Sequence, residues 1–145
     1  MVPVGEKFSP RTTVKQKPSL HKYSDFAIIG GVQVLFYQTS SGRSPVTDEL
    51  DSLPVQASAH AYELLDGIET YGLSAPRVIF RQLEGKLWEI KMNLPQTGGY
   101  RIFYCLIEAG NMILLHAYAK KSQKAPKKEL ETAWRRLLDA QKRGI

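Results

Sequence analysis

Two apolar segments in the C-terminal half restrict what this chain can fold into. YRIFYCLI (100–107) and NMILLHAYA (111–119) are separated only by EAG. Neither segment alternates cleanly between apolar and polar residues, which is typical of strands buried on both faces of a sheet. The connection is too short for a crossover between parallel strands. We therefore predict an antiparallel hairpin of two central strands.

Shorter segments with strand character lie on either side of a helical region. They are VQVLFY (32–37), bounded by GG and TSSG, and the segments 78–82 and 87–92, which flank a predicted turn at LEG. Val, Ile, Phe, Tyr and Trp favour strands, and glycine and serine favour the turns between them. The sequence thus predicts five strands.

Three segments have helical character. A short helix is predicted after Ser44, an N-cap candidate followed by Pro45, and it ends at Pro54. A second ends at Gly72, and an amphipathic C-terminal helix follows Pro126. The apolar positions at helical spacing are Ala57, Ala61, Leu64, Leu65 and Ile68 in the second helix, and Leu130, Ala133, Trp134, Leu137 and Leu138 in the last. The order β-α-α-β-β-β-β-α predicts an α+β fold with a largely antiparallel sheet, an N-terminal helical hairpin and a C-terminal helix.

Length and composition indicate one domain that follows an N-terminal extension. At 145 residues the chain suits a single core, and residues 1–30, with scattered prolines and basic residues, are expected to be a flexible basic extension before a domain at 31–145. The longest apolar stretch is about a dozen residues, whereas a membrane span needs about 20. No secretory signal is evident, and the lone Cys105 lies in an apolar strand. We expect a cytoplasmic protein with no membrane partner.

Net charge is concentrated at the C-terminal end. Residues 120–145 hold nine Lys/Arg and three Asp/Glu, whereas the rest of the chain holds eleven of each. Such a cluster is typical of a surface that binds a polyanion, although a solvated terminal helix would have the same composition. Charge alone leaves both interpretations open.

Strand alternation sorts the polar residues of the predicted sheet. Glu89 and Lys91 share one face of their strand, and His116, Tyr118 and Lys120 project to one side of theirs. Arg101 lies within an apolar central strand, where an unpaired charge is costly. It has two possible roles: a structural ion pair with Glu89, or a phosphate ligand that uses the planar fork of guanidinium donors.

Three ordered motifs carry a family resemblance. LWEIK, YRIFY and LLHAYAKKSQKAPKKELETA together resemble the phage-derived Gp49-like, HigB-type toxins of the RelE superfamily. The resemblance covers roughly residues 32–140. One departure is Lys91, which stands where the family commonly has arginine; it keeps the charge but loses bidentate contact.

The resemblance implies a RelE-like fold, in which a curved antiparallel sheet carries a basic site. It also implies the toxin of a type II toxin–antitoxin system that cleaves mRNA on the ribosome. The expected partners are mRNA, the ribosome and an antitoxin with a helix-turn-helix domain, with operator DNA bound only through that antitoxin.

Cleavage by the RNA 2′-OH needs a base, an acid and positive charge, and no metal or cofactor if side chains supply the charge. No clustered Asp, His and Cys ligand set is evident in the sequence. Candidate catalytic residues are Arg101 with Lys120 or Lys121 for charge, and His116 for proton transfer. Candidate RNA-binding residues are Lys91, Tyr118, Lys124 and Lys127. Tyr104 is a weaker proton-donor or stacking candidate, because a core aromatic fits the same pattern.

Structural and non-catalytic interpretations of the same residues remain open. His116 can equally be a hydrogen-bonded histidine of a central strand. The domain can be a non-catalytic RNA- or ribosome-binding module, or a protein-interaction domain whose last helix docks on a partner while its lysines stay solvated. Binding that is indifferent to charge reversal at Lys120 and Lys121 would indicate the last of these.

Overall fold

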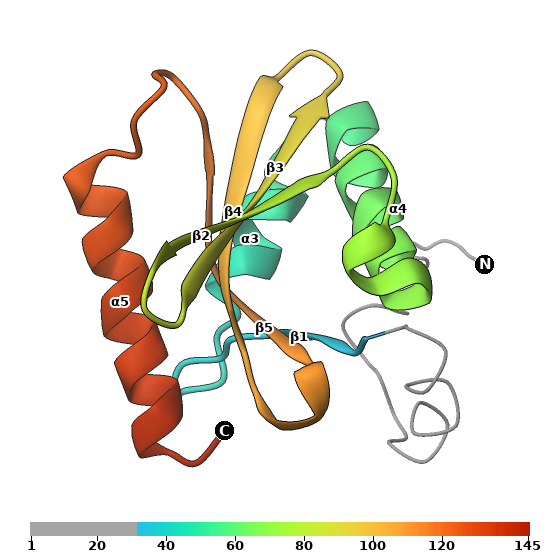
Figure 1. Ribbon diagram of the computed structural model, residues 1–145. Coiled ribbons are helices and arrows are strands. Elements are labelled where there is room, and N and C mark those ends of the chain that lie inside the picture. Colours follow the sequence, from blue (N-terminus) through green and yellow to red (C-terminus); the bar gives the residue numbers. More distant parts are fainter. Residues whose placement is uncertain (1–31) are drawn as a thin grey trace.

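One five-stranded sheet organises residues 32–145, the part of the chain that the computed structural model describes (Figure 1). Its order is β1-β5-β4-β3-β2, with β1 parallel to β5 and every other pair antiparallel. The strands are β1 (Val34–Phe36), β2 (Ile79–Glu84), β3 (Leu87–Leu94), β4 (Gly98–Leu106) and β5 (Met112–Ala119). The predicted central hairpin is confirmed as β4 and β5. The expected extension at residues 1–30 lies outside the described residues.

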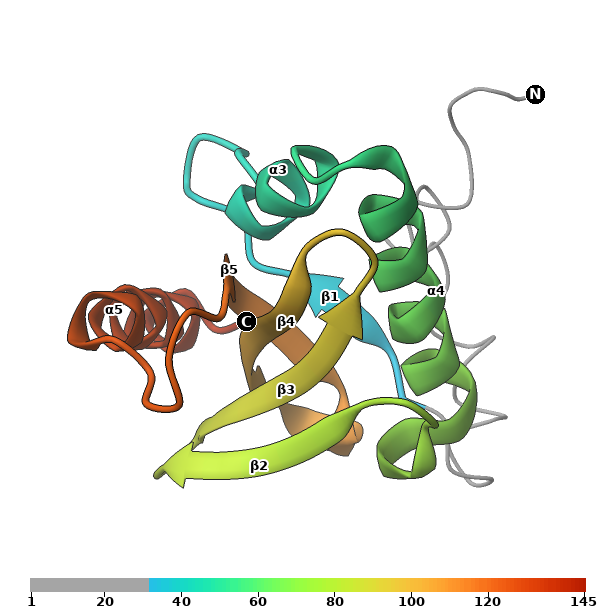
Figure 2. The same ribbon diagram turned by 90° about the horizontal axis from the view of Figure 1, so that it is seen from above.

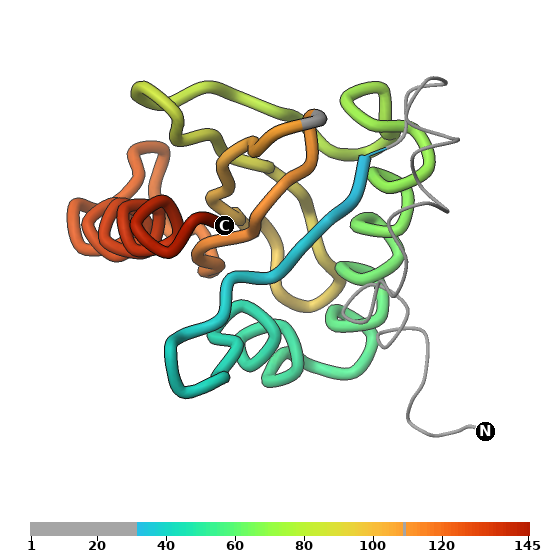
Figure 3. The backbone as a smooth tube through the Cα atoms, turned by 90° about the horizontal axis from the view of Figure 1, so that it is seen from below, coloured from blue at the N-terminus to red at the C-terminus, as the bar shows by residue number. Residues whose placement is uncertain are grey.

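Helices cover the two faces of the sheet separately. α3 (Pro45–Asp51) and α4 (Val55–Tyr71) pack on one face, and α5 (Lys127–Lys142) packs on the other. Figure 2 shows α5 on one side of the twisted sheet and α3 and α4 on the other, and Figure 3 gives the same layering from below. Each face has its own apolar cluster. The predicted α+β class and the element order are confirmed.

The helices begin and end at the serine, proline and glycine residues that the sequence predicts, with one difference. Ser44 is the N-cap of α3 and Pro45 opens the helix, but the Ser44 hydroxyl hydrogen-bonds the Thr47 hydroxyl at 2.7 Å and caps no backbone N–H. Pro54 precedes α4, and Gly72 ends it at a φ of 62°, a left-handed conformation that favours glycine. The predicted helix boundaries are therefore correct, although Ser44 acts through another side chain.

A register shift in the central hairpin changes which side chains face α5. Phe103 pairs with His116, but the next residue, Tyr104, pairs with Leu114. Leu115 is the extra residue, and it joins the apolar cluster under α5. His116 also faces α5, where it contacts Glu129. The bulge thus places two consecutive residues against the same helix.

The C-terminal helix is amphipathic, as predicted, but one of its expected core positions is wrong. Ala133, Leu137 and Ala140 are buried, and Leu130 and Trp134 pack partly against them. Leu138 is 58 % exposed. The buried stripe is narrower than the sequence pattern suggests, because α5 crosses the sheet as a single outer helix with solvent on its other side. None of the helices within residues 32–145 combines the length and apolar character needed to cross a membrane.

Adjacent leucines provide a test of this packing. Leu137 is 1 % exposed and Leu138 is 58 % exposed. We expect Leu137→Ala to lower the free energy of unfolding by about 2–5 kcal/mol, because it leaves a cavity between α5 and the sheet. We expect Leu138→Ala to change it by less than about 0.5 kcal/mol. Urea denaturation of both variants checks this, and equal losses would contradict the orientation of α5.

Candidate functional site

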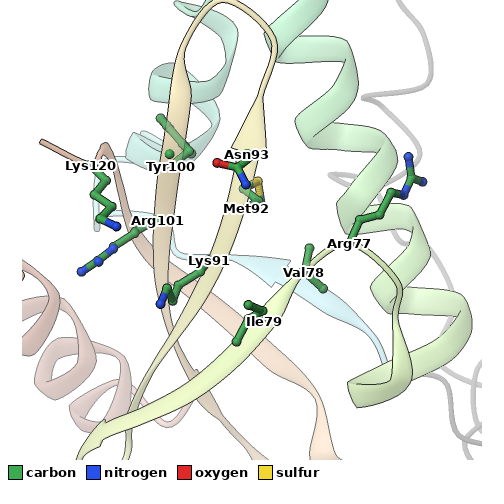
Figure 4. Close-up of a pocket in the computed structure, with 10 residues that line it drawn as sticks. Arg77, Val78, Ile79, Lys91, Met92, Asn93, Tyr100, Arg101 and Lys120 are labelled. Carbon is green, nitrogen blue, oxygen red and sulfur yellow. The ribbon is translucent and has the colours of Figure 1, made fainter. Parts of the chain in front are cut away.

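A basic cleft of about 400 Å³ lies where the sheet meets the segment that leaves β5. Three strands, the segment before β2 and the residue after β5 provide its walls. No carboxylate is among the lining residues, which are Arg77, Val78, Ile79, Lys91, Met92, Asn93, Gly99, Tyr100, Arg101 and Lys120. In Figure 4 Lys91, Arg101 and Lys120 extend to one side, whereas Arg77 points away from them. The cleft is therefore a concentration of positive charge.

Strand register brings two of these cations face to face. Lys91 on β3 pairs directly with Arg101 on β4, which in turn pairs with Tyr118 on β5. Like charges at directly opposed positions of a sheet are destabilising. A bound anion would relieve this repulsion, so the pairing favours an anion-binding role for the cleft.

Lys120 reaches the cleft by crossing a glycine. Its backbone N–H donates to the Gly99 carbonyl oxygen at 2.9 Å. A Cβ built on Gly99 would lie 3.3 Å from the Lys120 Cδ, tighter than ordinary van der Waals contact. The missing side chain at Gly99 therefore leaves space for the Lys120 methylenes to lie over β4. The ammonium group is held on the same side as Arg101 (Figure 4).

Arg101 forms the ion pair with Glu89 that the sequence left as one alternative, and it also lines the cleft. It is 1 % exposed, and its Nη1 lies 3.3 Å from Oε1 of Glu89, which is fully buried. Its Nη2 donates to the Gln123 carbonyl oxygen at 3.0 Å, which ties the segment after β5 to the sheet. Its Nε and Nη1 make no hydrogen bond. Arg101 is thus paired with Glu89 through Nη1 and with the Gln123 backbone through Nη2, and its buried Nε has no hydrogen-bond partner among residues 32–145.

Glu89 is shared between two arginines. Besides the ion pair with Arg101, its Oε2 accepts a hydrogen bond from Nε of Arg81 on β2 at 3.1 Å. From the sequence, Glu89 is expected only as a possible partner for Arg101. Arg81 was missed because its pairing depends on the β2–β3 register, which sets it directly opposite Glu89.

The remaining lysines do not join this cluster. Lys124 lies in a neighbouring cleft with Arg81, and Lys121 and Lys127 are exposed and line neither cleft. Lys127 is 4.0 Å from Glu131 one helical turn along α5. The structure therefore brings together Lys91, Arg101 and Lys120 of the eight candidates. It places Lys124 beside them.

His116 lies under α5 rather than in the cleft. Its Nε2 is 2.5 Å from Oε1 of Glu129, and Nη1 of Arg136 is 3.2 Å from its Nδ1. A guanidinium only donates, so Nδ1 accepts from Arg136 and Nε2 carries the proton that is donated to Glu129. Both nitrogens are engaged. This geometry matches the hydrogen-bonded histidine that the sequence left as an alternative.

The two tyrosine candidates are buried. Tyr118 packs between the rings of Phe103 and His116, at centroid distances of 5.4 and 6.0 Å. Burial raises the pKa of Tyr118, and the nearby Arg101 charge opposes that rise. Tyr104 lies on the opposite face, beside Phe80 and Trp88, and burial raises its pKa strongly. The structure thus makes Tyr104 a core aromatic and gives Tyr118 no exposed face for stacking.

Comparison with known proteins adds a family to this geometry. The family model described as phage derived protein Gp49-like (DUF891) matches residues 48–138, well over half of the chain. The chain belongs to this Gp49-like family. No curated protein matches it. The matched region includes the whole strand set of the cleft, from β2 to β5, and most of α5.

Several cleft residues of this Gp49-like chain had no signal in the sequence. Ile79, Asn93 and Gly99 line the cleft but belong to no motif that chemistry would single out. Asn93 could have been found from its spacing, because it lies two residues after Lys91 on the same face of β3. Within residues 32–145, no three His, Cys, Asp or Glu side chains are arranged to hold a metal ion.

The shared carboxylate gives a stability prediction. Glu89→Gln keeps the shape of the side chain but leaves Arg101 buried without a counter-charge. We expect the free energy of unfolding to fall by about 3–5 kcal/mol, the cost of removing one partner from a buried ion pair. Chemical denaturation measures the loss. Glu131→Gln, on the exposed surface of α5, is the matched control and should change stability by less than about 1 kcal/mol.

Tyr104 gives a pH prediction. Its pKa is raised in the folded state, so the fold loses stability as pH rises above the unfolded pKa of about 10, where only the unfolded chain ionises. The hydroxyl is also buried without a hydrogen-bond partner. We expect Tyr104→Phe to reduce the loss of stability between pH 9 and pH 11. Denaturation at both values measures it, with exposed Tyr71→Phe as the control; an unchanged alkaline loss would contradict the assignment.

Proposed function

We propose that this chain is the toxin component of a type II toxin–antitoxin system and acts as a ribosome-dependent mRNA endoribonuclease. The observation that carries the proposal is the cluster of Lys91, Arg101 and Lys120 in a cleft without a lining carboxylate. Membership of the Gp49-like family supports it, together with the motif resemblance to HigB-type toxins of the RelE superfamily. A RelE-like fold is part of the proposal, and the α+β element order agrees with it.

In this proposal the cleft holds the scissile phosphate of the RNA. The neighbouring 2′-OH attacks the phosphorus, the bond to the 5′ oxygen breaks, and the products are a 2′,3′-cyclic phosphate and a 5′-OH. Lys91, Arg101 and Lys120 stabilise the added negative charge of the pentacoordinate transition state. Arg101 is the strongest candidate, because its guanidinium is already desolvated and its Nε makes no hydrogen bond, while Nη1 is held by Glu89.

The predicted role of His116 in proton transfer requires a rearrangement. In this geometry the imidazole must first leave Glu129 or Arg136 before either nitrogen can exchange a proton with RNA. Lys121 and Lys127 are exposed in the part of the chain that follows β5. In this proposal they contact the RNA backbone and take no part in the cleavage step. The proposed mechanism uses side-chain cations and no metal ion.

The proposed partners follow from the same family argument. They are mRNA in the ribosome and an antitoxin that contains a helix-turn-helix domain. Operator DNA would be bound through that antitoxin only.

Induced expression in a bacterial host tests the proposed function. Wild type is compared with Lys91→Ala and Lys120→Ala, reading growth and mapping mRNA 5′ ends. We expect growth arrest and new, translation-dependent 5′ ends for wild type. Each variant should reduce cleavage at least ten-fold, because it removes a charge that would contact the transition state.

Lys142→Ala is the matched control, since it removes one exposed lysine at the far end of α5. It should cleave like wild type. Circular dichroism of the purified variants separates lost chemistry from lost folding. Normal growth and intact transcripts with folded wild-type protein would refute the endoribonuclease proposal.

One observation favours a second function, RNA or ribosome binding without cleavage. The residues that line the cleft include no imidazole and no carboxylate, and His116 is engaged by α5. The same experiment separates the two functions. Growth inhibition that depends on Lys120 but leaves every transcript intact would indicate a binding module.

A further inference from the structure

A second cleft, of about 500 Å³, lies beside the first and has no assigned role. Arg81 and Leu83 of β2 form one wall. Gln123 and Lys124, from the segment after β5, and Leu130 of α5 form the other. The carboxylate of Glu84 also lines the cleft, which therefore combines two cations, one anion and apolar side chains. Such a mixture suits a ligand that has both a charged and an apolar part.

The two clefts follow one another along the same face of β2. Ile79 lines the first cleft, and Arg81 and Leu83 line the second. Residues two apart on a strand share a face and are separated by about 7 Å. The walls opposite β2 are also formed by one stretch of chain, the segment after β5. Lys120 lines the first cleft, and Gln123 and Lys124 line the second. A linear molecule that leaves the first cleft along β2 enters the second.

A buried ion-pair network joins the clefts. Arg81 lines the second cleft, Arg101 lines the first, and the carboxylate of Glu89 binds both. Arg101 also donates to the backbone carbonyl oxygen of Gln123, which lines the second cleft. Glu89 is fully buried, so the ion pairs that connect the two clefts hold them at a fixed spacing.

The donors of the second cleft are available to a ligand. The Arg81 side chain is 51 % exposed, and among the described residues only its Nε is engaged, with Glu89. Its two terminal amino groups can therefore bind a phosphate. Lys124 is exposed and makes no ion pair within residues 32–145. Leu83 and Leu130 provide an apolar surface against which a ribose or base can pack.

We propose that this second cleft binds the nucleotide that neighbours the scissile phosphate, with its phosphate on Arg81 and Lys124 and its sugar or base against Leu83 and Leu130. The inference rests on the proposed function, since it takes RNA as the ligand of the first cleft. Single-stranded RNA fits better than an acidic peptide, because cations line both of the clefts that follow one another along β2 and an apolar surface accompanies them in the second.

Non-cleavable RNA tests the inference without requiring catalysis. A 2′-O-methylated dinucleotide and hexanucleotide lack the attacking hydroxyl. They are titrated into the full chain at several salt concentrations and followed by NMR. The indole N–H of Trp134 is a local reporter, because it donates to Glu84, which also lines the second cleft, at 3.2 Å. The other tryptophan, Trp88, packs on the α4 side of the sheet and is an internal control.

We expect the hexanucleotide to shift the Trp134 signal and leave Trp88 in place. The dinucleotide, which lacks the phosphate for Arg81 and Lys124, should shift the Trp134 signal less and also leave Trp88 in place. Lys124→Ala should reduce the salt dependence of hexanucleotide affinity by about 0.7 in log–log slope, one phosphate contact, and leave the dinucleotide unchanged. Lys142→Ala should match wild type with both RNAs.

Two results would overturn the inference in distinguishable ways. Hexanucleotide binding with an unmoved Trp134 signal and an unchanged slope for Lys124→Ala would refute the second cleft and leave the proposed function standing. Absence of binding by both RNAs to folded wild-type protein would refute RNA as the ligand of either cleft.

Discussion

The site depends on a buried carboxylate placed between two arginines. Glu89 is 0 % exposed and holds Arg81 on one side and Arg101 on the other. A buried charge is tolerated only when it is paired, so the three side chains must come together as the sheet forms. Arg101 then lies beneath the cleft with a fixed orientation, and through Gln123 it positions the lysine-rich segment after β5. A single ion-pair network thus connects the core of the sheet to its charged surface.

The two faces of the sheet each have an apolar cluster but differ in how far it extends. The α3–α4 face holds a continuous apolar cluster that includes Tyr104. The α5 face is only partly covered, and its uncovered end carries Lys91, Arg101 and Lys120. Repulsion between the opposed Lys91 and Arg101 lowers the stability of the unliganded fold.

The bulge in the central hairpin decides the position of His116. Because Leu115 is inserted opposite Phe103 and Tyr104, both Leu115 and His116 turn toward α5. Glu129 and Arg136 then engage the two imidazole nitrogens. The histidine joins α5 to β5, and the cleft is left with arginine and lysine side chains. This distribution leaves the cleft with positive charge and without an imidazole.

The sequence by itself determined the fold class and the element order, and it placed Glu89 and Lys91 on one face of their strand. Those features follow from local hydrophobic periodicity and from the helix start and stop residues Pro45, Pro54 and Gly72. Both signals are local and do not depend on residues far away in the sequence. Cross-strand register and helix packing decided the rest. They set Lys91 opposite Arg101, brought Arg81 to Glu89, and exposed Leu138 rather than Leu137. Such pairings join residues far apart in sequence, and their geometry is fixed only when the strands and α5 pack together.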